Sequence, residues 1–101
     1  GPEGQTMYPE GIEAKLNNEP YVSESLGSDE GGKRRALIYP DYQSAANQGL
    51  DTATIEKIME QNFEARNKEL PAYSRVSRCK IFLEEFEKTP KRSIKRFLYQ
   101  P

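Results

Sequence analysis

Residues 21–40 read YVSESLGSDEGGKRRALIYP, and the architecture of the chain is built around them. Their centre, residues 27–32, is GSDEGG, a cluster of turn-forming residues with glycine at both ends. We predict one strand over residues 21–26 and a second over residues 33–39, closed by Pro40. Two short strands joined by a glycine-rich connection are typical of a β-hairpin. A small sheet is therefore expected near the middle of the sequence.

A long helix is predicted after the hairpin, beginning at Asp51 or Thr52 and ending near Pro71. Both Asp51 and Thr52 are good helix caps, because their side-chain oxygens can accept a hydrogen bond from the first free backbone amides. Apolar residues then recur in steps of three and four, as one buried helix face requires. These residues are Ile55, Ile58, Met59 and Phe63. Residues 41–49 are polar and predict a loop or a loose turn of helix.

A third strand is predicted over residues 76–83, where charged and apolar residues alternate. We expect Cys79, Ile81 and Leu83 to face the core, because alternate side chains of a strand point to the same side. Cys79 is then interpreted as a small buried apolar residue, rather than as a reactive thiol.

A short helix is expected before the hairpin, starting at Pro9, which suits the first position of a helix. Glu13 lies in its early turns, where the helix dipole favours acidic side chains. Ile12 and Leu16 lie four residues apart and share one face. The order of elements predicts an α+β domain in which helices pack on a small sheet of about three strands.

The chain has 101 residues, which we interpret as one domain over residues 1–101. It has one cysteine and no histidine, which excludes Ser-His-Asp and Cys-His catalysis, histidine metal ligands and an internal disulfide. No metal site is therefore expected. No apolar run approaches the ~20 residues of a membrane span. The lone thiol and the absence of a signal-peptide pattern favour a cytoplasmic setting.

The net charge of −1 hides an asymmetry between the two ends of the chain. Residues 1–30 contain seven acidic side chains and one basic one, whereas residues 71–101 contain eight basic and three acidic ones. An anionic ligand should therefore meet the C-terminal third. The alternative is that this third is only a solvated charged surface.

Residues 84–99, which we call the basic tail, read EEFEKTPKRSIKRFLY. Five cations fall within the nine residues 88–96, and large apolar side chains follow them. This pattern is compatible with nucleic-acid binding, with a basic surface for a membrane or partner, or with phosphate handling. The isoelectric point near 5.6 and the lack of a nucleic-acid motif weigh against the first interpretation.

The basic tail resembles the C-terminal signature of the adenylate-forming superfamily, and specifically that of long-chain acyl-CoA synthetases. The superfamily pattern is Thr-Pro-x-Gly-Lys-(Ile/Val)-x-Arg, and Thr89, Pro90, Ile94 and Arg96 match it. Residues 4–13, GQTMYPEGIE, are similar to the family segment Gly-x-x-Ile-x-Pro-x-Glu-Ile-Glu, which follows the hinge between the two domains of these enzymes. The resemblance extends over essentially the whole chain.

The resemblance implies that this chain is the small, mobile C-terminal domain of a two-domain enzyme, without the large N-terminal AMP-binding domain. Such enzymes use ATP, with Mg²⁺ on its phosphates, to convert a fatty acid to an acyl-adenylate, and coenzyme A (CoA) then displaces AMP. The expected partners are the large domain, a fatty acid, ATP and CoA, but no nucleic acid. The isolated chain is expected to be inactive and to bind no cofactor.

The resemblance also implies site residues. The family's catalytic lysine aligns with Ser93, and its preceding glycine aligns with Arg92. In an extended segment Lys91 and Lys95 would share a face with Ser93, so we expect Lys91 or Lys95 to replace the lysine, with Lys91 preferred. The alternative is that the large domain supplies the charge.

At the other end of the chain, Gly4, Gln5 and Tyr8 fall in the segment that lines the CoA passage in the family. A second hypothesis belongs to a different class of function: the chain would be a non-catalytic interaction domain with a basic tail.

Overall fold

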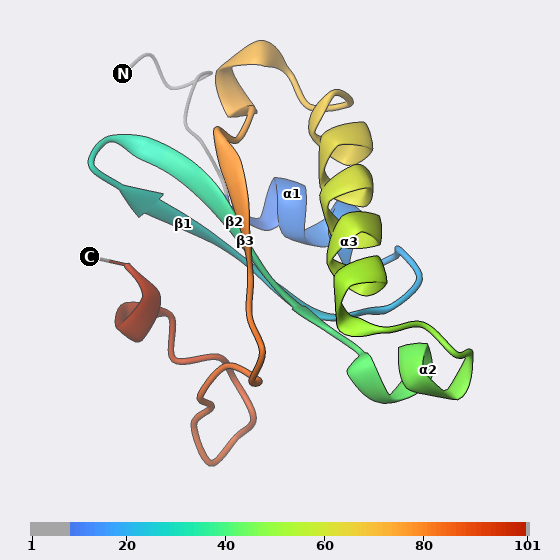
Figure 1. The fold of residues 1–101 in the computed structure, drawn as a ribbon. Helices are drawn as coiled ribbons and strands as arrows, with labels where there is room; N and C mark the ends of the chain where they lie inside the picture. Colours follow the sequence, from blue (N-terminus) through green and yellow to red (C-terminus); the bar gives the residue numbers. More distant parts are fainter. Residues whose placement is uncertain (1–8, 101) are drawn as a thin grey trace.

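The structure is a computed structural model that describes residues 9–100, and it has the expected α+β architecture (Figure 1). Its sheet contains β1 (Val22–Glu30), β2 (Lys33–Pro40) and β3 (Arg78–Ile81), in that order. β1 and β2 form the antiparallel hairpin, and β3 pairs with β2 in parallel. Because parallel neighbours need a long crossover, the chain between β2 and β3 is long and carries the longest helix.

The hairpin was predicted correctly, but its first strand is longer than expected. β1 continues through the polar residues to Glu30, which pairs with Lys33. Only Gly31 and Gly32 remain for the turn, with φ of 58° and 80°. Glycine adopts such left-handed conformations at no steric cost, and the primed turns of two-residue hairpins require them.

The long helix is confirmed as α3 (Thr52–Asn67). Asp51 is its cap, and the side chain accepts a hydrogen bond from the Thr54 amide at 2.8 Å. The predicted apolar face lies inward, with Ile55 and Met59 fully buried. A shorter helix, α2 (Tyr42–Asn47), occupies the segment for which a loop or a loose helical turn was expected. Its cap, Asp41, accepts from the Ser44 amide at 3.0 Å.

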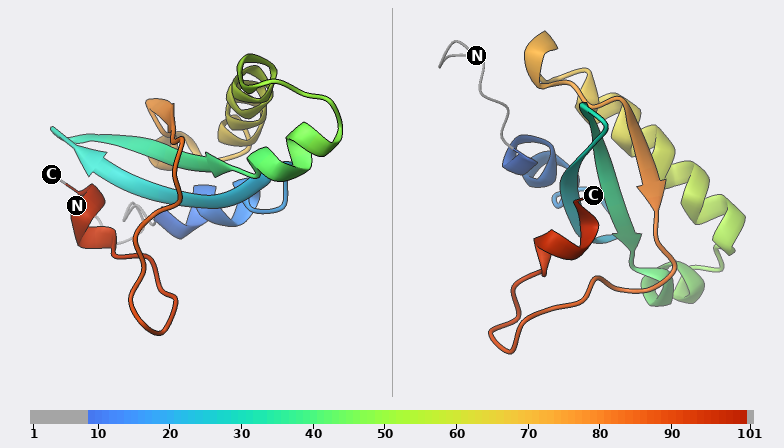
Figure 2. Two further views of the ribbon diagram at one scale, coloured as in Figure 1. Left: turned by 60° about the horizontal axis from the view of Figure 1, so that its bottom comes forward. Right: turned by 90° about the vertical axis from the view of Figure 1, so that its left-hand side faces the viewer.

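Side chains cover both faces of the sheet. One cluster joins α1 (Pro9–Leu16), α3 and one face of β2, and contains Ile12, Leu16, Ala36, Ile38, Ala45, Ile55, Met59, Phe63, Leu70 and Val76. The second cluster joins the opposite face to the basic tail, and contains Leu26, Leu37 and Phe86, with Tyr39, Phe82, Ile94 and Tyr99 around them. The basic tail and α3 therefore lie on opposite sides of the sheet (Figure 2).

The third strand is shorter than predicted. β3 ends at Ile81, and the last bond toward β2 is donated by the Phe82 amide to the carbonyl oxygen of Ile38, at 2.8 Å. Cys79 and Ile81 pack against the α3-side cluster, as expected. The inward position predicted for Leu83 is wrong: this side chain is 69% exposed. The chain leaves the ladder before Leu83, so strand alternation no longer governs its direction.

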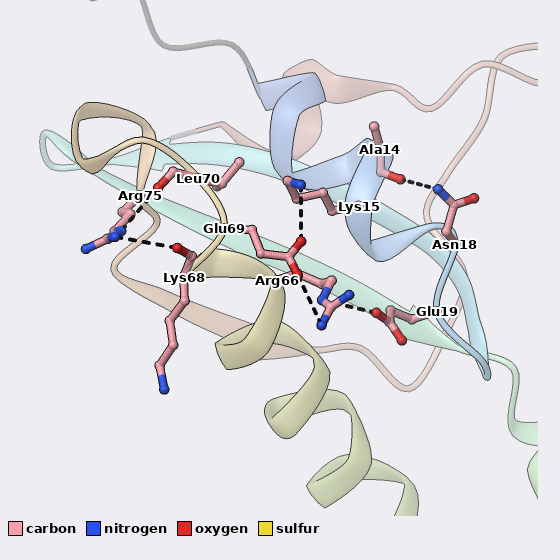
Figure 3. A network of polar contacts seen from close by, with 9 residues as sticks. All are labelled: Ala14, Lys15, Asn18, Glu19, Arg66, Lys68, Glu69, Leu70 and Arg75. Atoms are coloured by element: carbon pink, nitrogen blue, oxygen red, sulfur yellow. Dashed lines mark hydrogen bonds and ion pairs between the residues drawn. The ribbon is translucent and has the colours of Figure 1, made fainter.

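Polar contacts fix α1 and the segment after it against the C-terminal end of α3 (Figure 3). Lys15 of α1 lies 3.2 Å from a carboxylate oxygen of Glu69, whose other oxygen lies 3.3 Å from Arg66. Arg66 also pairs with Glu19 at 3.2 Å. This network complements the apolar contact of Ile12 and Leu16 in holding α1 in place.

Candidate functional site

The basic tail folds back on itself as a small hairpin. Lys88 and Ile94 form an antiparallel bridge, and the Lys95 amide donates to the carbonyl oxygen of Glu87 at 2.9 Å. At the tip, the Arg92 amide donates to the Thr89 carbonyl, and the Thr89 amide donates to the Ser93 carbonyl, both at 2.8 Å. We call residues 89–93 the 89–93 loop.

The loop corrects one expectation from the sequence. Residues 91–95 were expected to be extended, with Lys91, Ser93 and Lys95 on one face, but residues 89–93 form a closed turn. Pro90 explains the turn, because its fixed φ suits the second position of a tight turn. Strand alternation therefore does not determine which cation lies beside Ser93.

Lys88 anchors the base of the loop to β1. Its ammonium nitrogen lies 2.7 Å from a carboxylate oxygen of Glu24, and the two side chains are only 11% and 16% exposed. The hydrogen bond to Glu24 raises the pKa of Lys88 above its ordinary value of 10.5, which outweighs the opposing effect of burial. The ammonium group also donates to the Phe86 carbonyl at 3.2 Å. Lys88 thus has a structural role: its contacts hold the basic tail against β1.

Arg96 anchors the other end of the loop to α1. Its two terminal nitrogens each lie 2.8 Å from one oxygen of Glu13. Glu13 is buried and also accepts the Gly27 amide of β1 at 2.7 Å. The sequence interpretation of Glu13 as a helix-dipole residue missed this role. Its position three residues before the buried Leu16 places it on the inward helix face, which was the available signal.

Tyr99 closes the basic tail onto the sheet. Its ring meets Phe82 and Phe86 edge-on, with centroids 5.8 and 5.1 Å away, a favourable arrangement for aromatic pairs. Its hydroxyl accepts the Glu87 amide at 2.9 Å, and its carbonyl accepts the Ser28 hydroxyl. The basic tail is thus held at three points around the 89–93 loop.

The structure divides the five tail cations into two groups. Lys88 and Arg96 are committed to the ion pairs with Glu24 and Glu13. Lys91, Arg92 and Lys95 make no ion pair with the residues that the structure describes; Lys91 and Arg92 are exposed, and Lys95 is partly buried. The two candidate lysines and Arg92 are therefore available to an anion from outside.

A shallow cavity of about 420 Å³ lies between the 89–93 loop and β1. Its walls are largely polar, and it is lined by Asn17, Ser23, Glu24, Ser25, Arg92, Ser93, Ile94 and Arg96. Ser93, at the family's lysine position, faces this cavity together with Arg92, whereas neither Lys91 nor Lys95 lines it. The three residues expected at the CoA passage, Gly4, Gln5 and Tyr8, lie outside the described residues.

Within residues 9–100 no group of three or more Cys, Asp or Glu side chains is placed to hold a metal ion. No helix in this part of the chain is long and apolar enough to cross a membrane.

A mixed three-stranded sheet with helices on one face and an anchored cationic loop on the other is the fold of the C-terminal domain of adenylate-forming enzymes. The chain belongs to the family described as the AMP-binding enzyme C-terminal domain, which matches residues 2–99. No curated protein matches it in sequence.

Solved structures with the same fold include three CoA ligases. A benzoate CoA ligase from Burkholderia xenovorans LB400 is 19% identical, with a TM-score of 0.61 over 90% of this chain. A Mycobacterium tuberculosis fatty acyl CoA synthetase is 19% identical, with a TM-score of 0.58 over 94% of the chain. The anthranilate CoA ligase AuaEII, solved in complex with anthranoyl-AMP, is 21% identical, with a TM-score of 0.63 over 92% of the chain.

The chain spans only a small part of these enzymes, namely 18%, 19% and 16% of their respective lengths. At these identities the similarity establishes a common fold.

Proposed function

We propose that this chain is the C-terminal domain of an ATP-dependent, AMP-forming ligase that joins a long-chain fatty acid to CoA in the cytoplasm. The observation that carries the proposal is the group Lys91, Arg92 and Lys95, which make no ion pair with any residue from 9 to 100. The segment that bears them is fixed by the buried Glu13 and the partly buried Glu24. Family membership supports the ligase chemistry. The resemblance of both chain ends to long-chain acyl-CoA synthetases supports the fatty acid, as does the fatty acyl CoA synthetase among the structural neighbours.

The reaction has two steps. In the first, a carboxylate oxygen of the fatty acid attacks the α-phosphorus of ATP, and the bond to the bridging oxygen breaks. Pyrophosphate leaves with that electron pair, so the product is an acyl-adenylate. In the second step the CoA thiolate attacks the acyl carbon and AMP leaves.

The role of this chain is electrostatic. Negative charge is concentrated around the α-phosphorus in the first step, and a fixed cation there stabilises the transition state. We propose Lys91 or Lys95 as that cation, in place of the lysine that Ser93 replaces. Arg96 and Lys88 keep the loop in position through Glu13 and Glu24. Carrying the cation on a mobile domain allows it to be withdrawn before the second step.

The second step has its own proposed residues. We propose that Gly4, Gln5 and Tyr8 line the CoA passage, since residues 4–13 resemble the family segment with that role. The large N-terminal domain is the proposed partner and the site of most ATP and fatty-acid contacts, with Mg²⁺ on the ATP phosphates.

The test is a ligase assay on the longer protein that carries residues 1–101, using ATP, CoA and carboxylic acids of increasing chain length. We expect acyl-CoA and AMP to form with long-chain acids, and no turnover by residues 1–101 alone. Loss of adenylate formation in Lys91→Ala or Lys95→Ala would identify the substituting lysine, and wild-type rates in both would exclude these two. A non-catalytic interaction domain predicts no product with any acid.

A further inference from the structure

We infer that Arg92 is a further catalytic residue of this loop, and that its guanidinium contacts the anionic oxygens of the reacting carboxylate and α-phosphate. The inference rests on the proposed ligase function and names a residue within it. Three independent features of Arg92 carry it: its backbone conformation, its place on the cavity wall and the chemistry of its side chain.

The backbone of Arg92 has φ of 69°, in the left-handed region that favours glycine. In short hairpin connections, the residue after the two central residues of the turn often adopts this conformation and is usually glycine. Arg92 has that place, because its amide donates to the Thr89 carbonyl and so closes the turn around Pro90 and Lys91. Arginine here destabilises the turn relative to glycine. Strained positions of this kind are concentrated at functional sites, where the side chain is needed despite the strain.

The loop has little freedom to relax. The Arg92 amide is bonded to the Thr89 carbonyl, and the Lys88–Ile94 bridge closes the turn below it. The ion pairs of Lys88 and Arg96 fix both ends. The left-handed conformation is therefore maintained by the surrounding contacts, and the side chain leaves the loop in a defined direction.

That direction is the cavity of about 420 Å³ against β1. Its tail wall is formed by Arg92, Ser93, Ile94 and Arg96, and the β1 wall by Ser23, Glu24 and Ser25. The Glu24 carboxylate is already paired with Lys88. Arg96 is already paired with Glu13. Arg92 is thus the cation of this wall that makes no ion pair with any residue in the described range, and it stands next to the family's lysine position.

The guanidinium suits the proposed contact. It stays protonated throughout, and its planar fork can donate two parallel hydrogen bonds to carboxylate or phosphate oxygens. When the carboxylate oxygen bonds to the α-phosphorus and pyrophosphate leaves, Arg92 transfers no proton. It only stabilises the charge on the oxygens around phosphorus.

The test compares Arg92→Gly, Arg92→Lys and the control Lys57→Ala in the full-length ligase. Lys57 is an exposed α3 lysine that makes no ion pair with the described part of the chain. The readouts are fatty-acid-dependent ATP–pyrophosphate exchange, thioester formation from supplied acyl-adenylate and CoA, and melting temperature.

We expect Arg92→Gly to reduce exchange by about 10²–10³-fold, as for removal of one preorganised donor. Thioester formation should be unchanged. The melting temperature should stay the same or rise, because glycine adopts the left-handed conformation without strain. Arg92→Lys should retain more exchange than Arg92→Gly, and Lys57→Ala should match the wild type.

Exchange within twofold of wild type in Arg92→Gly overturns the inference and leaves the ligase proposal intact. Equal losses in exchange, thioester formation and melting temperature also overturn it, because they indicate a structural role. A wild-type protein that shows no exchange with any carboxylic acid overturns the proposed function, and the inference with it.

Discussion

Glu13 and Arg96 are 83 positions apart in the sequence, yet they form a two-pronged ion pair in which both nitrogen–oxygen distances are 2.8 Å. The pair ties the first helix to the end of the 89–93 loop, and the Gly27 amide adds β1 to the same carboxylate. Glu13 belongs to the N-terminal family-like segment and Arg96 to the C-terminal one, so these two residues bring the signatures at opposite ends of the sequence into contact.

Replacing either partner should destabilise the fold. We expect Glu13→Gln to lower the free energy of unfolding by about 1–3 kcal/mol, below the value for a fully buried pair because Arg96 is 43% exposed. Urea unfolding of Glu13→Gln, Arg96→Met and the double variant measures the coupling, which should reach about 1–2 kcal/mol. Purely additive losses would show that the pair contributes nothing specific.

The Lys88–Glu24 pair should make stability sensitive to alkaline pH. The pKa of Lys88 is raised in the folded chain, so its stabilising effect is complete below the unfolded value of 10.5 and is lost as pH rises through the folded value. The wild type should therefore lose stability above about pH 10 more steeply than Lys88→Met. Lys91→Met is the matched control and should keep the wild-type slope; identical slopes in all three proteins would rule out the linkage.

The hydroxyl and the ring of Tyr99 should make separate contributions to the free energy of unfolding. Tyr99→Phe removes the acceptor of the Glu87 amide and should cost about 0.5–1.5 kcal/mol. Tyr99→Ala also removes the edge-on contacts with Phe82 and Phe86, so its loss should be larger. Chemical unfolding of both variants checks the order, and an unchanged stability in Tyr99→Ala would mean that the basic tail is not held by this ring.

Cys79 should react slowly with thiol reagents in the native protein. Burial is the largest cause that raises its pKa, to about 11, so little thiolate exists near pH 8. We expect iodoacetamide to label the thiol many times faster in urea than in buffer. Equal rates in the two conditions would place this side chain in solvent.

Local patterns were sufficient to predict most of the fold. The steps of three and four from Ile55 to Phe63 correspond to the buried face of α3, and the run Ala36–Leu37–Ile38 is buried on both faces of β2. Such patterns report contacts that neighbouring residues make with one common core. The end of β3 was missed because it depends on where the chain leaves β2, a contact across more than forty residues.

The candidate site was harder to predict, because its geometry comes from long-range pairs. The sequence identified the cationic segment but gave it an extended shape. It did not separate Lys88 and Arg96 from the three cations that make no ion pair within residues 9–100. That division depends on Glu13 and Glu24, which lie far away in the chain and are brought to the basic tail by the sheet. Arg92 was assigned only to the family's glycine position, and its left-handed φ is visible only in the folded loop.

The central claim is that Lys91, Arg92 and Lys95, the tail cations without an ion pair inside residues 9–100, act in adenylate formation alone. The most direct measurement is the ratio of fatty-acid-dependent ATP–pyrophosphate exchange to thioester formation from acyl-adenylate, in full-length protein with Lys91, Arg92 and Lys95 all changed to alanine. Our account predicts that exchange falls by about 10²-fold or more while the thioester rate stays near that of the wild type. Unchanged exchange in this triple variant would contradict it.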